Sequence, residues 1–150
     1  LYLKEGELEA HNRKLQGKYR EIRDKEVRFE EVQTDDAELV VAAFGTSARI
    51  ARSAVNKARA KGLKVGLFRP VTVFPFPSRR LEELSGSVGK FLVVEMNTGQ
   101  MVEDVRLAAG CRAKVDFYGR PGGGTPTPME ILGEIERRYQ MKEEGSGKRE

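Results

Sequence analysis

Hydrophobic residues in this chain gather in short runs, and each run is followed by a segment in which apolar residues recur at helical spacing. Runs of four to six residues suit strands that are buried on both faces of a sheet. The predicted strands are Leu39–Phe44, Val65–Phe68, Phe91–Val94 and, for the fourth repeat, Ala113–Tyr118. Four strand–helix repeats predict an α/β fold, in which a parallel sheet carries helices on both faces and is connected by right-handed crossovers.

Glycine, proline and capping residues mark the ends of the predicted elements. The segment Gly45–Ser47 turns the first strand into a helix, which Gly62 ends. The prolines of Val71–Pro77 exclude a regular strand there. The segment Thr127–Glu130 has the pattern of a capping box with proline at the first helical position. It predicts a last helix that runs to about Met141.

Both ends of the chain are more polar than its middle. Residues 1–26 are predicted to form a charged helical arm with a thin apolar stripe, ordered only by packing on a neighbouring domain. A short strand at Val27–Val32 can add at a sheet edge. Residues 143–150 contain no apolar residue, so a disordered tail is expected after an α/β domain that spans residues 27–142. Because the chain begins with Leu rather than Met, we interpret it as a piece of a longer protein.

The third repeat, Phe91–Val105, places polar side chains where its strand becomes a helix. Open parallel sheets hold their ligands at the carboxyl ends of strands, where the strand order reverses. If the order reverses between the first and third repeats, Phe44–Ser47 and Glu95–Gly99 flank one crevice with no strand between them. We then expect Glu95 to project near the N-terminal end of the helix that follows the first strand, where a carboxylate is favoured.

Each candidate site residue at this edge has a second interpretation, in which it only caps a helix or faces solvent. The amides of Gly45–Ser47 could hold a phosphate or carboxylate, or a hydroxyl of this segment could simply cap its helix. Asn97 and Gln100 have the spacing of an asparagine variant of the capping box. Glu95 belongs either to an interface or site, or to a solvated strand end. In either case Glu95→Gln is expected to cost the isolated chain little.

Two arginines, Arg69 and Arg120, each follow a strand and precede proline. They could clamp an anionic group or a partner's carboxylate, or remain solvated. The complete set of candidate crevice or interface residues is Gly45, Thr46, Ser47, Arg69, Glu95, Asn97, Gly99, Gln100 and Arg120.

Charge and composition exclude several classes of function. The net charge is +4, but basic and acidic residues are interleaved, so a nucleic-acid-binding stripe is not indicated. There is no run of 18 apolar residues that could span a membrane. The single cysteine, Cys111, excludes an internal disulfide and a self-contained Fe–S site, and the single histidine, His11, lies in the arm. The sequence contains neither Gly-x-Gly-x-x-Gly, the fingerprint of dinucleotide binding, nor Gly-Lys-Ser/Thr, that of nucleoside-triphosphate binding.

Four separated motifs, in the right order, resemble the 2-oxoacid:ferredoxin oxidoreductases. The motifs are Val40–Ser47, Arg69–Pro77, Leu92–Met101 and Phe117–Gly124. The resemblance covers roughly residues 26–139 and is to the C-terminal, transketolase C-terminal-like domain of the alpha subunit. The segments Val27–Glu31 and Asn97–Gln100 most resemble the branched-chain 3-methyl-2-oxobutanoate (2-ketoisovalerate) type. The 2-oxoglutarate and pyruvate types are alternatives.

The resemblance implies a three-layer α/β/α sandwich with a five-stranded, mostly parallel sheet and an antiparallel edge strand. It implies a cytoplasmic enzyme that decarboxylates a 2-oxoacid on thiamine diphosphate and Mg, passes electrons through Fe–S clusters to ferredoxin, and makes an acyl-CoA. This chain lacks the Gly-Asp-Gly…Asn thiamine-diphosphate motif and a set of cluster cysteines. We therefore expect that it binds no cofactor and carries no catalytic residue. Its expected partners are other domains and subunits of the complex, with no nucleic acid and no membrane.

Three functions remain open from the sequence. The first is a non-catalytic structural and assembly domain of such an oxidoreductase, unable to oxidise a 2-oxoacid alone. The second is a free-standing flavodoxin-like module that binds a small ligand. The third is a regulatory or CoA-contacting domain of the same enzyme.

Overall fold

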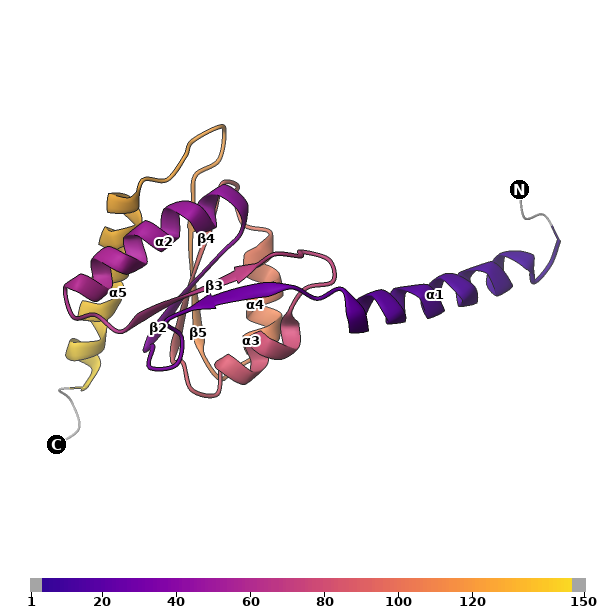
Figure 1. The fold of residues 1–150 in the computed structure, drawn as a ribbon, viewed down its shortest axis with the longest axis horizontal. Coiled ribbons are helices and arrows are strands. Elements are labelled where there is room, and N and C mark those ends of the chain that lie inside the picture. The colour runs from indigo at the N-terminus through magenta and orange to yellow at the C-terminus, as the bar shows by residue number, and fades with distance from the viewer. Residues whose placement is uncertain (1–3, 147–150) are drawn as a thin grey trace.

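A central sheet lies between two layers of helices, and a further helix, α1 (Glu7–Lys25), extends away from them (Figure 1). This computed structural model describes residues 4–146. The strands are β1 (Phe29–Val32), β2 (Leu39–Ala43), β3 (Val65–Pro70), β4 (Lys90–Glu95) and β5 (Lys114–Gly119). The remaining helices are α2 (Gly45–Ala60), α3 (Ser78–Leu84), α4 (Met101–Ala109) and α5 (Pro128–Ser146).

Strand β2 occupies the centre of the sheet, whose order is β1-β3-β2-β4-β5. It pairs in parallel with β3 on one side and with β4 on the other, and Leu39 lies opposite Val65 and Lys90 respectively. Strand β5 continues the sheet in parallel, whereas β1 is antiparallel to β3 at the opposite edge. This arrangement confirms the mixed five-stranded sheet and the predicted reversal of strand order between the first and third repeats.

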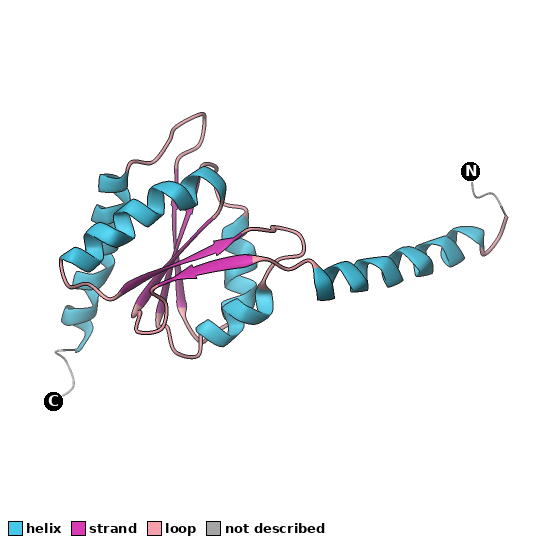
Figure 2. Ribbon diagram, viewed as in Figure 1, coloured by secondary structure: helices cyan, strands magenta, loops and turns pink. Residues whose placement is uncertain are grey.

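The two faces of the sheet are covered by different helices, α2 and α5 on one face and α3 and α4 on the other (Figure 2). Helix α2 packs on the sheet through small side chains, which let it approach closely without losing helix propensity. These residues are Ala48, Ala51, Ala54 and Ala58. The other face buries larger groups, including Phe68, Leu81 and Phe91. Each such side chain contributes about 1.5–3 kcal/mol when fully buried.

Helix α5 continues to Ser146, beyond the predicted end at Met141 and into the segment expected to be disordered. Two of residues 143–146 are glutamates, which are good helix formers, and an existing helix extends by one hydrogen bond per residue. Residues 147–150 lie outside the described part of the chain. The arm forms the predicted helix over Glu7–Lys25, and residues 1–3 are not described.

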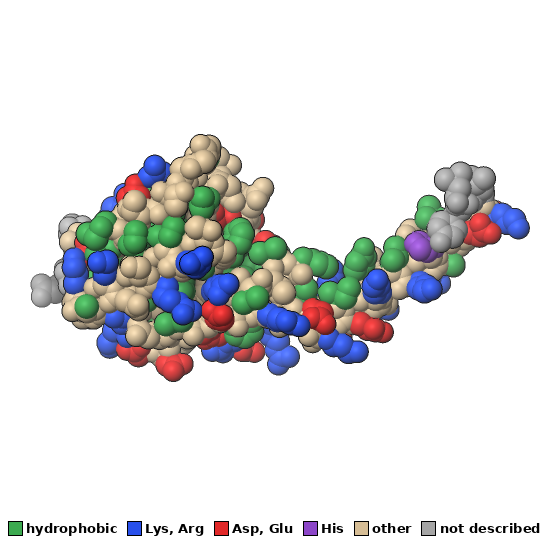
Figure 3. Space-filling model, turned by 45° about the horizontal axis from the view of Figure 1, so that its top comes forward, with side chains coloured by type: hydrophobic (Ala, Val, Ile, Leu, Met, Phe, Trp, Pro, Cys, Tyr) green, Lys and Arg blue, Asp and Glu red, His purple; other side chains and the backbone are tan. Residues whose placement is uncertain are grey.

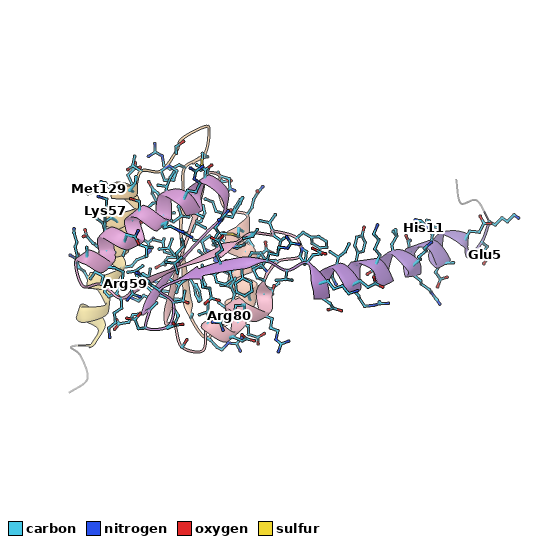
Figure 4. All side chains as sticks on the ribbon, in the orientation of Figure 1. Glu5, His11, Lys57, Arg59, Arg80 and Met129 are labelled. Carbon is cyan, nitrogen blue, oxygen red and sulfur yellow. The ribbon has the colours of Figure 1, made fainter. Side chains whose placement is uncertain are left out.

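Two arginines attach the edge strand β1 and its following turn to the body; Figure 4 labels both. Arg59 of α2 donates to the carbonyl oxygens of Gln33 and Val65, at 2.6 Å each, and to both carboxylate oxygens of Asp36. Arg80 of α3 donates through Nε to Glu31 Oε1 at 2.6 Å and through Nη2 to Glu31 Oε2 at 3.1 Å. The short edge strand is therefore held by guanidinium groups from both helical layers.

Candidate functional site

The carboxyl ends of β2 and β4 are neighbours, so Phe44–Ser47 and Glu95–Gly99 lie on one edge with no strand between them. This placement agrees with the expected crevice. A hollow of about 270 Å³ opens there. Its lining residues are Phe44, Val73, Phe76, Glu95, Gln100, Met101 and Asp104.

Glu95 is completely buried at the end of β4, and its carboxylate binds the start of helix α4. The oxygens accept hydrogen bonds from the backbone N–H groups of Met101 at 2.9 Å and Val102 at 3.0 Å. The N–H of Gln100 donates to both oxygens at 3.2 and 3.3 Å, and Asn97 Nδ2 donates to Oε2 at 3.1 Å. These donors and the positive end of the helix dipole offset the desolvation of a buried charge.

Glu95 therefore binds the start of α4 rather than that of α2, and the alternative of a solvated strand end is wrong because Glu95 is buried. The free amides nearest to a carboxylate at the end of β4 are those of the helix that the same chain begins a few residues later. The expectation that Glu95→Gln costs the isolated chain little loses its basis, because the substitution removes a buried charge with several donors.

Asn97 shapes the turn between β4 and α4. Its Oδ1 accepts the N–H of Gly99 at 2.7 Å, an Asx turn, while its amide nitrogen holds Glu95. Gly99 has φ 110, which favours glycine. The asparagine-variant capping box is not formed, because Gln100 stands at the N-cap without a side-chain cap bond. Glu95 instead accepts the N–H groups of Gln100, Met101 and Val102 at the start of the helix.

Helix α2 begins at Gly45, with Phe44 at the N-cap and no side-chain cap bond. The alternative in which Thr46 or Ser47 caps this helix is therefore wrong, since both hydroxyl residues already lie inside its first turn. Arg69, on the neighbouring strand β3, donates to Glu30 on β1 at 3.0 Å.

The backbone N–H of Arg120 donates to the carbonyl oxygen of Glu95 at 3.1 Å, whereas its side chain pairs with Glu130 at the start of α5. The capping box of α5 is confirmed, because Thr127 N donates to Glu130 Oε2 at 2.7 Å and Glu130 N donates to Thr127 Oγ1 at 3.2 Å. Hydrogen bonds from Thr127, followed by the charge of Arg120, lower the pKa of Glu130. Arg120 thus secures a helix cap rather than lining the crevice hollow.

The sequence-based interpretation missed an exposed apolar surface beside the crevice, which we call the apolar rim. It consists of Tyr19, Val71, Val73 and Phe74. Val73 is 54% exposed and Phe74 is 59% exposed. The ring of Tyr19 meets that of Phe74 edge-on, with centroids 6.3 Å apart. Figure 3 shows hydrophobic side chains gathered where α1 leaves the body. Apolar residues in an irregular, proline-rich segment were the signal available in the sequence.

The described residues do not provide the ligands of a resident metal or cluster. Within residues 4–146, no group of three or more His, Cys, Asp or Glu side chains could hold a metal ion. The one cysteine, Cys111, is exposed, and a cluster needs several thiolates. Glu95, the acidic group buried in the crevice, is already occupied by the amides of α4. Mg and an Fe–S cluster therefore have no ligand set among these residues.

None of the described helices is long and apolar enough to cross a membrane.

These features define a doubly wound α/β domain whose strand-end polar groups mainly stabilise its own helix starts. Residues 37–131 match the family described as pyruvate:ferredoxin oxidoreductase core domain II. The chain belongs to the 2-oxoacid:ferredoxin oxidoreductase family, as its motifs indicated.

Relatives from two methanogens support this assignment. The chain is 50% identical over 135 residues to "Ketoisovalerate oxidoreductase subunit VorB" of Methanothermobacter thermautotrophicus, covering 90% of this chain and 38% of that protein. It is 39% identical over 113 residues to "2-oxoglutarate synthase subunit KorA" of Methanothermobacter marburgensis, covering 75% of this chain and 30% of that protein. The chain thus spans well under half the length of these relatives.

A solved structure has the same fold. It is the 2-oxoglutarate:ferredoxin oxidoreductase from Magnetococcus marinus, with 2-oxoglutarate, coenzyme A and succinyl-CoA bound. The TM-score is 0.78 with 24% sequence identity, covering 91% of this chain and 24% of that chain.

Proposed function

We propose that this chain is a non-catalytic structural and assembly domain in the alpha subunit of a cytoplasmic 2-oxoacid:ferredoxin oxidoreductase. The whole enzyme would use thiamine diphosphate, Mg and Fe–S clusters carried elsewhere. It would convert a 2-oxoacid, CoA and oxidised ferredoxin to an acyl-CoA, CO₂ and reduced ferredoxin. The observation that carries the branched-chain type is the 50% identity to a ketoisovalerate subunit, against 39% to a 2-oxoglutarate subunit.

The crevice supports assembly rather than chemistry. Its buried carboxylate already accepts hydrogen bonds from α4, and the described body between β1 and α5 contains no histidine. Next to it, the apolar rim exposes two aromatic rings and two valines to solvent. Exposed apolar patches mark interaction surfaces, and interface centres are enriched in aromatic anchors.

Helix α1 gives a second surface for assembly. It buries none of its residues against the body. The stripe predicted from the sequence, Leu8, Leu15, Tyr19 and Ile22, is exposed or half-buried. A helix of this length gains most of its stability from packing its apolar face, so we assign this stripe to contact with another domain of the subunit.

The test uses the assembled oxidoreductase that contains this domain. Val73→Asp and Phe74→Asp place a charge in the apolar rim and are expected to reduce the complex recovered by size-exclusion chromatography. Leu107→Asp is the matched control, because Leu107 is 83% exposed on α4 and outside the rim. Normal assembly of both rim variants would refute the interface.

Substrate type is tested separately with the unaltered complex. Ferredoxin or viologen reduction should be faster with 3-methyl-2-oxobutanoate than with 2-oxoglutarate or pyruvate. A preference for either of the other acids would overturn the branched-chain assignment. The 150-residue chain alone should reduce neither acceptor above a blank, and any such reduction would overturn its non-catalytic role.

A further inference from the structure

A second hollow, on the opposite face of the sheet from the crevice, is lined mainly by arginine. It has a volume of about 420 Å³, within the ~300–1,000 Å³ range of ligand pockets. We call it the arginine pocket; its lining residues are Glu30, Ala48, Arg49, Arg52 and Arg69. Ala48 packs in the core under α2 and α5, whereas Phe44 and Phe76 of the crevice pack with α3 and α4.

Positively charged side chains outnumber negatively charged ones in this pocket. Glu30 is the one carboxylate, and its Oε2 accepts from Arg52 Nη2 at 3.1 Å and from Arg69 Nη1 at 3.0 Å. Arg49 makes no hydrogen bond or ion pair with any described residue. Three guanidinium groups therefore face one carboxylate, which leaves an excess of two positive charges.

The donors also exceed the acceptors. Arg69 Nε is buried and has no hydrogen-bond partner among the described residues, although the side chain as a whole is 33% exposed. Buried donors in native proteins are nearly always paired, so this atom leaves the group of arginines short of one acceptor. Arg69 is held in place by its cross-strand neighbour Glu30, which lies directly opposite it in the sheet.

Helix α2 adds to the positive potential. Ala48, in its first turn, forms part of the pocket wall. The first turn contains no acidic residue, and the N-cap provides no side-chain acceptor. The positive end of the helix dipole is therefore not neutralised by the chain itself.

We propose that the arginine pocket binds a phosphate-type oxyanion. Guanidinium groups form paired, charge-assisted hydrogen bonds with phosphate oxygens, and a dianion matches the excess charge of the pocket better than a single carboxylate does. This site goes beyond the proposed function and does not depend on it. The phosphate is either inorganic phosphate or the terminal group of a nucleotide.

The test is an NMR titration of the ¹⁵N-labelled chain with inorganic phosphate and, separately, with ADP, against chloride at matched ionic strength. Saturable shifts of the Arg49, Arg52 and Arg69 side-chain signals and of the Ala48 amide are expected. A lower Kd for ADP would identify a nucleotide phosphate, and equal or weaker binding of ADP would identify the free ion. Shifts that chloride reproduces for both anions would overturn the site.

Substitutions in the pocket test whether its positive charge strengthens phosphate binding. Arg49→Gln should raise the Kd about tenfold, the equivalent of one charge-assisted hydrogen bond. Glu30→Gln should lower the Kd, because it removes the competing carboxylate. Lys57→Gln is the matched control, since this exposed residue lies on α2 away from the pocket (Figure 4). An equal effect of Lys57→Gln and Arg49→Gln, or weaker binding by a folded Glu30→Gln chain, would overturn the proposal.

Discussion

At the scale of single residues, the polar groups at the strand ends act mainly on the chain's own backbone. Glu95 binds the start of α4, Asn97 closes the turn before it, and Glu130 caps α5. Glu95 and Glu130 each supply a hydrogen-bond partner that a helix terminus lacks. These positions therefore bear on stability first and reach function only through the surfaces that they hold in place.

Glu95→Gln is expected to destabilise the chain by about 2–3 kcal/mol, because hydrogen bonds to a charged acceptor are worth roughly 1.5–3 kcal/mol and the amide turns a donor toward backbone N–H groups. Chemical denaturation measures this loss. Glu103→Gln on the same helix is the control, expected within about 0.5 kcal/mol, since Glu103 is exposed. Equal stabilities of the two variants would contradict the role given to Glu95.

Gly119→Ala is expected to destabilise the chain by about 1–3 kcal/mol through overpacking. A Cβ atom there would lie 2.4 Å from the carbonyl oxygen of Asn97, a backbone atom that cannot easily move. Gly133→Ala, in helix α5 with open space around it, should instead raise the stability by up to about 1 kcal/mol. Thermal unfolding measures the stability of both variants. A change of stability in the same direction for both would contradict the prediction.

At the scale of elements, long-range hydrogen bonds connect helices α5 and α3 to the sheet and the loops that border it. Tyr139 of α5 donates its hydroxyl to the carbonyl oxygen of Lys64, just before β3, at 2.7 Å. Burial, and then the negative charge of Glu38, raise the pKa of Tyr139 to about 12. Arg80 of α3 lowers the pKa of Glu31 on β1 mainly through its hydrogen bonds.

Tyr139→Phe should lower the stability by about 1 kcal/mol at neutral pH, through loss of one hydrogen bond. A pKa raised on folding adds stability that is fully present below the unfolded value near 10.0 and lost as the pH rises toward about 12. The difference in free energy of unfolding between wild type and variant should therefore shrink between pH 10 and pH 12. Tyr19→Phe on α1 is the control, and a constant difference for Tyr139→Phe would refute this linkage.

Helix α1 should exchange its amide hydrogens rapidly in the monomeric chain, while the central strands β2 and β4 stay protected. The reason is that α1 buries no residue, whereas β2 is buried along its whole length. Hydrogen–deuterium exchange with mass spectrometry reads both regions in one experiment. Strong protection of α1 in a demonstrated monomer would contradict an arm that awaits a partner; protection in a dimer would not.

At the scale of the whole molecule, the stability resides in the sandwich and the association surfaces lie at its margins. Two hydrophobic cores share one sheet. The apolar rim, the stripe of α1 and the charged residues of the arginine pocket all lie outside them. This separation permits surface changes that alter assembly or anion binding without unfolding the domain.

Removal of residues 1–26 should lower the free energy of unfolding of the remaining domain by no more than about 1.5 kcal/mol. The arm meets the body through the edge-on pair of Tyr19 and Phe74, and such pairs contribute about 0.5–1.5 kcal/mol beyond their area. Guanidinium unfolding of the full and shortened chains measures the difference. A loss above about 3 kcal/mol would show that the arm belongs to the folding unit.

The sequence by itself determined the features that depend on near neighbours in the chain. The buried strands appear as local apolar runs, and their repeats with helices imply the reversal at β2. The capping box of Thr127 and Glu130 was predictable because its two partners are three residues apart. The crevice edge followed from the rule that parallel strands end on the same side.

Tertiary structure alone decided which side chains meet. The partner of Glu95 depends on the path of a turn, which places the amides of α4 closer than those of α2. Tyr19 and Phe74 come together across distant segments, and Glu30, Arg49 and Arg69 converge from β1, α2 and β3. Sequence patterns report the burial of each residue along its own element, whereas these contacts depend on how the elements are placed against one another.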